Sequence, residues 1–194
     1  MYYFTNNFED DCLTMFLYLE QLPLFTTRNR EKYGGGKPIL SNVYGTTCFS
    51  HTVSHNKKFY RTKNPDGYGY LTKLRNSHPE FADIFKEFIE LYGDSFKFNQ
   101  VVINKDFKIT RHLDASNVGE SIIIGLGDYE GGELCLERDG KIQTHSIKER
   151  FLKFNGSKIY HYVKDFTGIR YSLVFYNTET PKKKLKNENL KPKQ

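Results

Sequence analysis

The second half of the chain alternates short apolar segments with tight turn signals, and this pattern restricts the fold more than any other feature. From residue 96 onward we predict eight strands, over residues 96–104, 108–112, 121–126, 133–138, 141–147, 151–154, 159–163 and 168–176. Asp139-Gly140 is a two-residue hairpin signal, and Gly131-Gly132 marks a second tight turn. Many short strands joined by tight turns favour packed antiparallel sheets.

Two helices are predicted before these strands. Residues 7–22 place apolar side chains at helical spacing, with Asn6 or Asn7 as the cap. The second helix is predicted to begin at Ser77, in a capping box with Glu80, and to end at Gly93. Its apolar stripe consists of Phe81, Ile84, Phe85, Phe88, Ile89 and Tyr92. We therefore predict an α+β fold with a jelly-roll core buttressed by N-terminal helices.

Charge divides the chain into a body and a tail. The formal net charge is +6, but residues 181–194 alone carry six Lys and one Glu. The other 180 residues carry 23 basic and 22 acidic groups, so the body is nearly neutral. We predict one domain over residues 1–178 and a basic, disordered tail over residues 179–194. Such a tail can bind nucleic acid through phosphates or act as a nuclear-import signal.

Three cysteines, Cys12, Cys48 and Cys135, are widely spaced and form no disulfide framework. This favours a reducing, intracellular compartment, cytoplasmic or nuclear. The sequence contains no apolar run long enough to span a membrane and no secretory signal at its N-terminus. We expect a monomer.

His112-Leu113-Asp114 is the stretch that carries chemistry. On an extended segment, side chains at i and i+2 point to the same face, so one imidazole and one carboxylate meet at one spot. If His161 arrives from a later strand, two histidines and one carboxylate bind a metal from one side. That arrangement is typical of a non-haem Fe(II) oxygenase.

Arg170 follows His161 by nine residues, within an otherwise apolar strand. A buried guanidinium needs an anionic partner, and its planar fork matches a carboxylate. Ser172 would face the same side and can add a hydrogen bond. The pair is a suitable site for the distal carboxylate of 2-oxoglutarate, although a protein carboxylate is the alternative partner.

Together these motifs resemble the Fe(II)/2-oxoglutarate dioxygenases with a double-stranded β-helix fold. Residues 117–121 (NVGES), 127–134 (GDYEGGEL) and 168–174 (GIRYSLV) are most similar to the TET/JBP branch, which oxidises the 5-methyl group of pyrimidines in nucleic acid. Residues 98–104 (FNQVVIN) also resemble the AlkB demethylases, in which such an asparagine contacts 2-oxoglutarate. Asp106 stands where that family has a tyrosine.

The resemblance implies a catalytic site and its cofactors. His112, Asp114 and His161 would bind Fe(II), while Arg170, Ser172 and Asn104 would bind 2-oxoglutarate, with O₂ as the oxidant. Succinate and carbon dioxide would accompany hydroxylation of a C–H bond.

The substrate is predicted to be a pyrimidine 5-methyl group in DNA or RNA. Candidate substrate residues are His51, His55, Arg61 and Asn117. His51 and His55 flank a poor helix-forming segment, so we place them in a polar loop near the substrate rather than on a metal. Two alternatives stay open: a prolyl-type, lysyl-type or small-molecule hydroxylase on the same scaffold, and a non-catalytic relic that binds nucleic acid.

Overall fold

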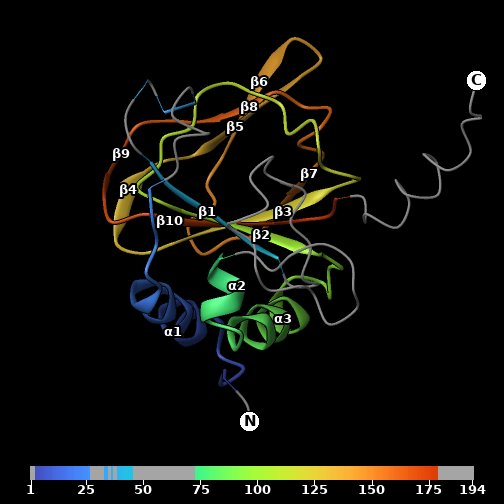
Figure 1. Ribbon diagram of the computed structural model, residues 1–194. Coiled ribbons are helices and arrows are strands. Elements are labelled where there is room, and N and C mark those ends of the chain that lie inside the picture. The colour runs from blue at the N-terminus through green and yellow to red at the C-terminus, as the bar shows by residue number, and fades with distance from the viewer. Residues whose placement is uncertain (1–2, 27–32, 35, 37–38, 46–72, 179–194) are drawn as a thin grey trace, which may run out of the picture.

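Figure 1 presents a computed structural model, which describes residues 3–26, 33–34, 36, 39–45 and 73–178. The predicted substrate residues His51, His55 and Arg61 lie outside the described residues, as do Cys48 and the basic tail. Within the described residues, no helix has the length and apolar character needed to cross a membrane.

Antiparallel strands form three sheets. The large sheet has the order β1-β2-β10-β3-β7, with β1 (Leu40–Gly45), β2 (Gln100–Lys105), β10 (Tyr171–Tyr176), β3 (Ser121–Leu126) and β7 (Leu152–Phe154). The three-stranded sheet has the order β6-β5-β8, with β6 (Lys141–His145), β5 (Leu134–Arg138) and β8 (His161–Val163). A two-stranded sheet pairs β4 (Tyr129–Gly131) with β9 (Phe166–Gly168).

Three helices gather on one side of the large sheet, and the three-stranded sheet lies on its other side (Figure 1). They are α1 (Phe8–Gln21), α2 (Lys73–Ser77) and α3 (Phe81–Tyr92). The Asn7 side chain caps α1 by accepting hydrogen bonds from the backbone N–H groups of Glu9 and Asp10. The helix predicted over residues 7–22 is therefore confirmed, with its cap at the second of the two candidate asparagines.

Alternation along β10 points its side chains into two different cores. Tyr171, Leu173 and Phe175 of β10 pack into the core beneath α1 and α3, which buries the aromatic stripe of α3. The opposite face of β10 carries Ser172 and Val174, which line the space between the large and three-stranded sheets. One strand thus anchors the helices and forms a wall of the interior pocket.

Two sequence predictions about local structure are wrong. Ser77 does not cap α3: it ends the short α2, and its hydroxyl donates to the carbonyl oxygen of Leu74. The turn at Pro79 separates the two helices, so the capping box never forms. Residues 108–112 are not a strand either, because only His112 forms an isolated bridge, with His161. The sequence pattern also missed the short strands β4 and β9.

The hairpin predicted at Asp139-Gly140 is confirmed. It joins β5 to β6, and both residues have positive φ, 51° and 72°. Two consecutive positive φ values are typical of the tight turn that matches the twist of paired strands. The two cysteines within the described residues, Cys12 and Cys135, are buried and free.

Candidate metal centre

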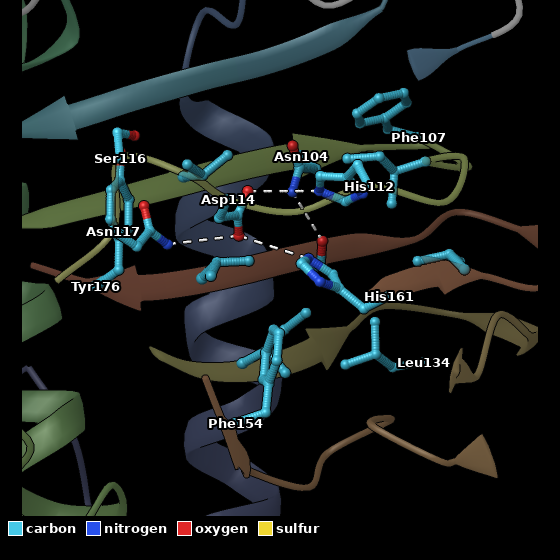
Figure 2. Close-up of a pocket in the computed structure, with 16 residues that line it drawn as sticks. Asn104, Phe107, His112, Asp114, Ser116, Asn117, Leu134, Phe154, His161 and Tyr176 are labelled. Atoms are coloured by element: carbon cyan, nitrogen blue, oxygen red, sulfur yellow. Dashed lines mark hydrogen bonds and ion pairs between the residues drawn. The ribbon is translucent and has the colours of Figure 1, made fainter. Parts of the chain in front are cut away.

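His112, Asp114 and His161 converge on one point at the open edge between the two larger sheets (Figure 2). One potential ligand atom from each lies within 4.8 Å of the other two. The Asp114 carboxylate lies 3.4 Å from His112 Nε2 and 3.5 Å from His161 Nε2. Two imidazole nitrogens and a carboxylate on one side form a donor set that suits Fe(II) with open positions opposite.

Backbone geometry holds the two histidines in register. His112 and His161 exchange both main-chain hydrogen bonds, at 3.0 and 3.1 Å. Each Nδ1 lies 2.9 Å from the carbonyl oxygen two residues earlier, Thr110 for His112 and Ile159 for His161. A carbonyl acceptor fixes the proton on Nδ1 and leaves Nε2 with a lone pair for a metal. The local structure therefore prepares both imidazoles in the tautomer that a metal requires.

Asp114 is held by its own contacts. Its backbone N–H donates to the Gly156 carbonyl oxygen at 2.9 Å, and a β-carbon at Gly156 would lie 2.9 Å from Asp114 Oδ2. Burial alone would raise the pKa of this carboxyl, but the neighbouring His112 and His161 imidazoles outweigh it and hold the pKa well below its usual range. Asp114 is therefore an anion at neutral pH, ready to bind a cation.

A pocket extends inward from this cluster between the two sheets. Its polar wall is formed by Asn104, Ser116, Asn117 and Ser172, and its apolar wall includes Phe107, Ile109, Leu134, Phe154 and Val163. Figure 2 shows Asn104, His112, Asp114 and His161 pointing toward one another, with Phe154 beneath them. The pocket therefore joins a candidate metal site to an interior chamber with both polar and apolar walls.

Arg170 immediately precedes β10 and is fully buried. Its Nη2 donates to the Gly132 carbonyl oxygen at 3.2 Å, while Nε and Nη1 have no hydrogen-bond partner among the described residues. The rings of Tyr129 and Phe166 flank the guanidinium carbon at 5.4 and 5.3 Å. Burial lowers the pKa of Arg170, with Tyr129 and Asp106 acting in the opposite direction.

A buried guanidinium with two unused donors is a site prepared for an anion. Asp106 does not supply that anion, because its Oδ1 accepts a hydrogen bond from the backbone N–H of Arg170, at 2.8 Å. The alternative partner that the sequence left open, a protein carboxylate on the guanidinium, is therefore not found among the described residues. An external carboxylate fits the donors that remain.

No protein-family model and no curated protein matches the chain, but solved structures share its fold. An oxidoreductase of the 2OG-Fe(II) oxygenase family from Burkholderia pseudomallei aligns with a TM-score of 0.55 and 20% identity, over 84% of this chain and 77% of that one. The chain has the fold of a 2OG-Fe(II) oxygenase.

Two further solved structures align with lower scores. NgTET1 in complex with 5mC DNA aligns with a TM-score of 0.49 and 14% identity, over 90% of this chain and 76% of that one. A Pseudomonas putida prolyl-4-hydroxylase aligns with a TM-score of 0.40 and 17% identity, over 52% of this chain and 68% of that one. These two scores are too low to choose between substrate classes.

The structure brings together six residues that the sequence singled out, and it adds others that the sequence missed. Three of the six, His112, Asp114 and His161, form the cluster, and Asn117 contacts Asp114. Asn104 and Ser172 line the pocket behind it. Residues missed by sequence reasoning are Ser41, which contacts Asn104, and Tyr129 and Gly132, which contact Arg170. Tyr129 and Gly132 lie in the segment 127–134 that carries the resemblance, but the sequence predicted no site role for either, and nothing in the local sequence connects Ser41 with the site.

Proposed function

We propose that this protein is an Fe(II)- and 2-oxoglutarate-dependent dioxygenase, built as one catalytic domain over residues 1–178 on a double-stranded β-helix. The single observation that carries the proposal is the His112–Asp114–His161 cluster at a pocket lined by Ser172, with the buried, incompletely paired Arg170 two residues before that serine. A metal cluster or a buried arginine alone has many explanations. Their combination on this fold is the arrangement that a metal and a dicarboxylate co-substrate require.

In this proposal His112, Asp114 and His161 hold Fe(II), and Arg170 with Ser172 binds the distal carboxylate of 2-oxoglutarate. When bound, Fe(II) with 2-oxoglutarate and O₂ supplies the oxidation of a substrate C–H bond to an alcohol, with release of succinate and carbon dioxide. The chain's own residues orient the co-substrate and exclude water. Arg170 contributes charge-assisted hydrogen bonds in a low-dielectric environment, where they are strong.

For the substrate we propose a pyrimidine 5-methyl group in nucleic acid. The support is the resemblance of residues 117–121, 127–134 and 168–174 to the TET/JBP branch, together with the position of Asn117 at the pocket. Asn117 Nδ2 donates hydrogen bonds to Asp114 Oδ2, at 3.4 Å, and to Ser121 Oγ, at 3.2 Å. Because the nitrogen makes both contacts, the side-chain carbonyl oxygen is available to a base. A base in a duplex would have to leave the stack to reach this pocket, at a cost of a few kcal/mol.

A protein or small-molecule hydroxylase is the second candidate, and the charge distribution favours it. The groove beside the cluster contains Lys108, Arg111 and Lys164 as well as Glu133, Glu137 and Asp165. Arg111 is paired with Glu137 at 2.6 Å, and Lys108 with Asp165 at 2.5 Å. The groove is thus balanced in charge, whereas nucleic-acid grooves are normally basic.

Two measurements test the proposal. Anaerobic addition of Fe(II) and 2-oxoglutarate should produce a weak visible charge-transfer band, and a protein that binds neither would refute the enzyme assignment, leaving the non-catalytic alternative. Oxidation of 5-methylcytosine DNA, thymine DNA and RNA, followed by mass spectrometry of the nucleosides, tests the substrate. Succinate formation with peptides or small molecules, and no oxidised base, would favour the second candidate.

A further inference from the structure

Three buried polar side chains cross the large sheet in a single row. Ser41 of β1 and Ser172 of β10 are both cross-strand partners of Asn104 in β2. All three are buried, with exposures of 3%, 8% and 3% for Ser41, Asn104 and Ser172. Polar groups in such a position are costly unless hydrogen-bonded, so the arrangement of their hydrogen bonds has consequences for the site.

The hydrogen bonds along this row all run in one direction, from Ser41 through Asn104 to Ser172. Ser41 Oγ donates to Asn104 Oδ1 at 2.6 Å, and Asn104 Nδ2 donates to Ser172 Oγ at 3.1 Å. The shorter distance is typical of a hydroxyl donating to oxygen, and the longer one of an amide N–H donating to oxygen. With the amide rotated by 180°, Ser172 would instead have to donate its own proton to Asn104. The short contact from Ser41 therefore holds the Oδ1 end of the amide, and the Nδ2 end faces Ser172.

This direction determines what Ser172 can offer to a ligand. A serine hydroxyl has one proton and two lone pairs. Asn104 occupies one lone pair, and among the described residues Ser172 Oγ takes part in no other hydrogen bond. Its proton is thus available for donation into the pocket, which Asn104 and Ser172 both line.

We infer that Asn104 is a positioning residue that, held by Ser41, turns the hydroxyl of Ser172 into a committed donor for the distal carboxylate of 2-oxoglutarate. This inference rests on the proposed function and deepens it. The sequence predicted that Asn104 binds 2-oxoglutarate directly, whereas in this inference Asn104 acts on the co-substrate through Ser172. An anion gains from a hydroxyl that cannot turn its lone pairs toward it, since no donor has to be reoriented on binding.

A double-mutant cycle on the full chain tests the inference. The measurement is the affinity for 2-oxoglutarate by titration calorimetry with Mn(II), a redox-inactive probe metal, for the wild type, Asn104→Ala, Ser172→Ala and the double variant. Ser172→Ala should weaken binding about 10- to 100-fold, the range for a hydrogen bond to a charged group. Asn104→Ala should weaken it about 3- to 10-fold in the wild-type background and have no effect in the Ser172→Ala background.

A matched ligand separates positioning from general damage. 2-Oxopentanoate lacks the distal carboxylate, so the variants should bind it within about 2-fold of the wild type. If Asn104→Ala does not fold, Ser41→Ala replaces it in the cycle and should behave in the same way, because the amide loses the contact that orients it.

The outcomes separate this inference from the proposed function. A wild-type protein that binds no 2-oxoglutarate in the presence of Mn(II) overturns the proposed function, and the positioning role with it. A wild type that binds, with an Asn104→Ala effect that persists unchanged without Ser172, overturns the positioning role alone and makes Asn104 a direct ligand. Equal losses for 2-oxoglutarate and 2-oxopentanoate also overturn it.

Discussion

Arg170 and Gly132 fit together so closely that neither can change without affecting the other. The Gly132 carbonyl oxygen accepts the hydrogen bond from Arg170 Nη2 at 3.2 Å, and a β-carbon at Gly132 would lie 2.7 Å from Arg170 Nε. Gly132 also has a positive φ of 69°. The second glycine of the Gly131-Gly132 turn therefore makes room for the guanidinium, which the sequence pattern alone did not reveal.

Gly132→Ala should displace Arg170 and weaken 2-oxoglutarate binding at least about 10-fold, because the new methyl group occupies the space of Nε. Gly140→Ala is the matched control, since it has a similar φ of 72° but open space around its β-carbon. Both variants should lose about 1–2 kcal/mol of stability from the positive φ. Titration calorimetry should separate them, and equal affinities would contradict a spatial role for Gly132.

Arg170→Met should raise the thermal stability of the ligand-free protein while greatly reducing 2-oxoglutarate affinity. The buried guanidinium is incompletely paired, and replacing such a charge by an apolar side chain of similar length is often stabilising, by about 1–4 kcal/mol. Exposed Arg138→Met is the control and should change neither property. Thermal unfolding and calorimetry measure the two effects. A large loss of stability in Arg170→Met would mean that the arginine is structural rather than kept for a ligand.

His112→Ala and Asp114→Ala should abolish Fe(II)-dependent turnover and reduce metal affinity, because each removes one of three donors. His78→Ala is the control: it also removes an imidazole, but from the turn between α2 and α3, outside the cluster. It should leave turnover and metal affinity unchanged. Anaerobic Fe(II) titration with a competing chelator measures the affinity. Normal metal binding in both cluster variants would disprove the assigned centre.

Asp11→Asn should destabilise the protein at neutral pH, by about 1–3 kcal/mol, because the Asp11 carboxylate accepts several hydrogen bonds. Burial favours the neutral form of Asp11, but hydrogen bonds from Tyr92, Thr5 and Asn6 outweigh it and lower the pKa. A group with a lowered pKa stabilises the folded state above its ordinary titration range, and this contribution is lost as the pH falls.

The stability difference between the wild type and Asp11→Asn should therefore shrink as the pH falls below about 4, the ordinary range of an aspartate. Urea unfolding across pH measures it. Exposed Asp10→Asn is the control, with little change expected at any pH. A difference that stays constant down to low pH would show that the ionised form of Asp11 is not what stabilises the fold.

Sequence pattern predicted the elements with a strong apolar signal. The stripe from Phe81 to Ile89 identified α3, and a continuous apolar run identified β3 with its observed bounds. It failed where tertiary contacts decide the structure. Ser77 matches the capping motif yet ends a separate turn of helix, and residues 108–112 alternate like a strand but form a single bridge, at His112, among the described residues.

The sequence by itself determined which chemical groups are available: two histidines, an aspartate and a lone arginine among apolar residues. Their meeting depends on tertiary structure, because 47 residues separate Asp114 from His161 and the backbone bridge between His112 and His161 brings them together. The same applies to Ser41, whose contact with Asn104 exists only because β1 pairs with β2 in that register. Strand register, which local sequence specifies weakly, decides which side chains act together.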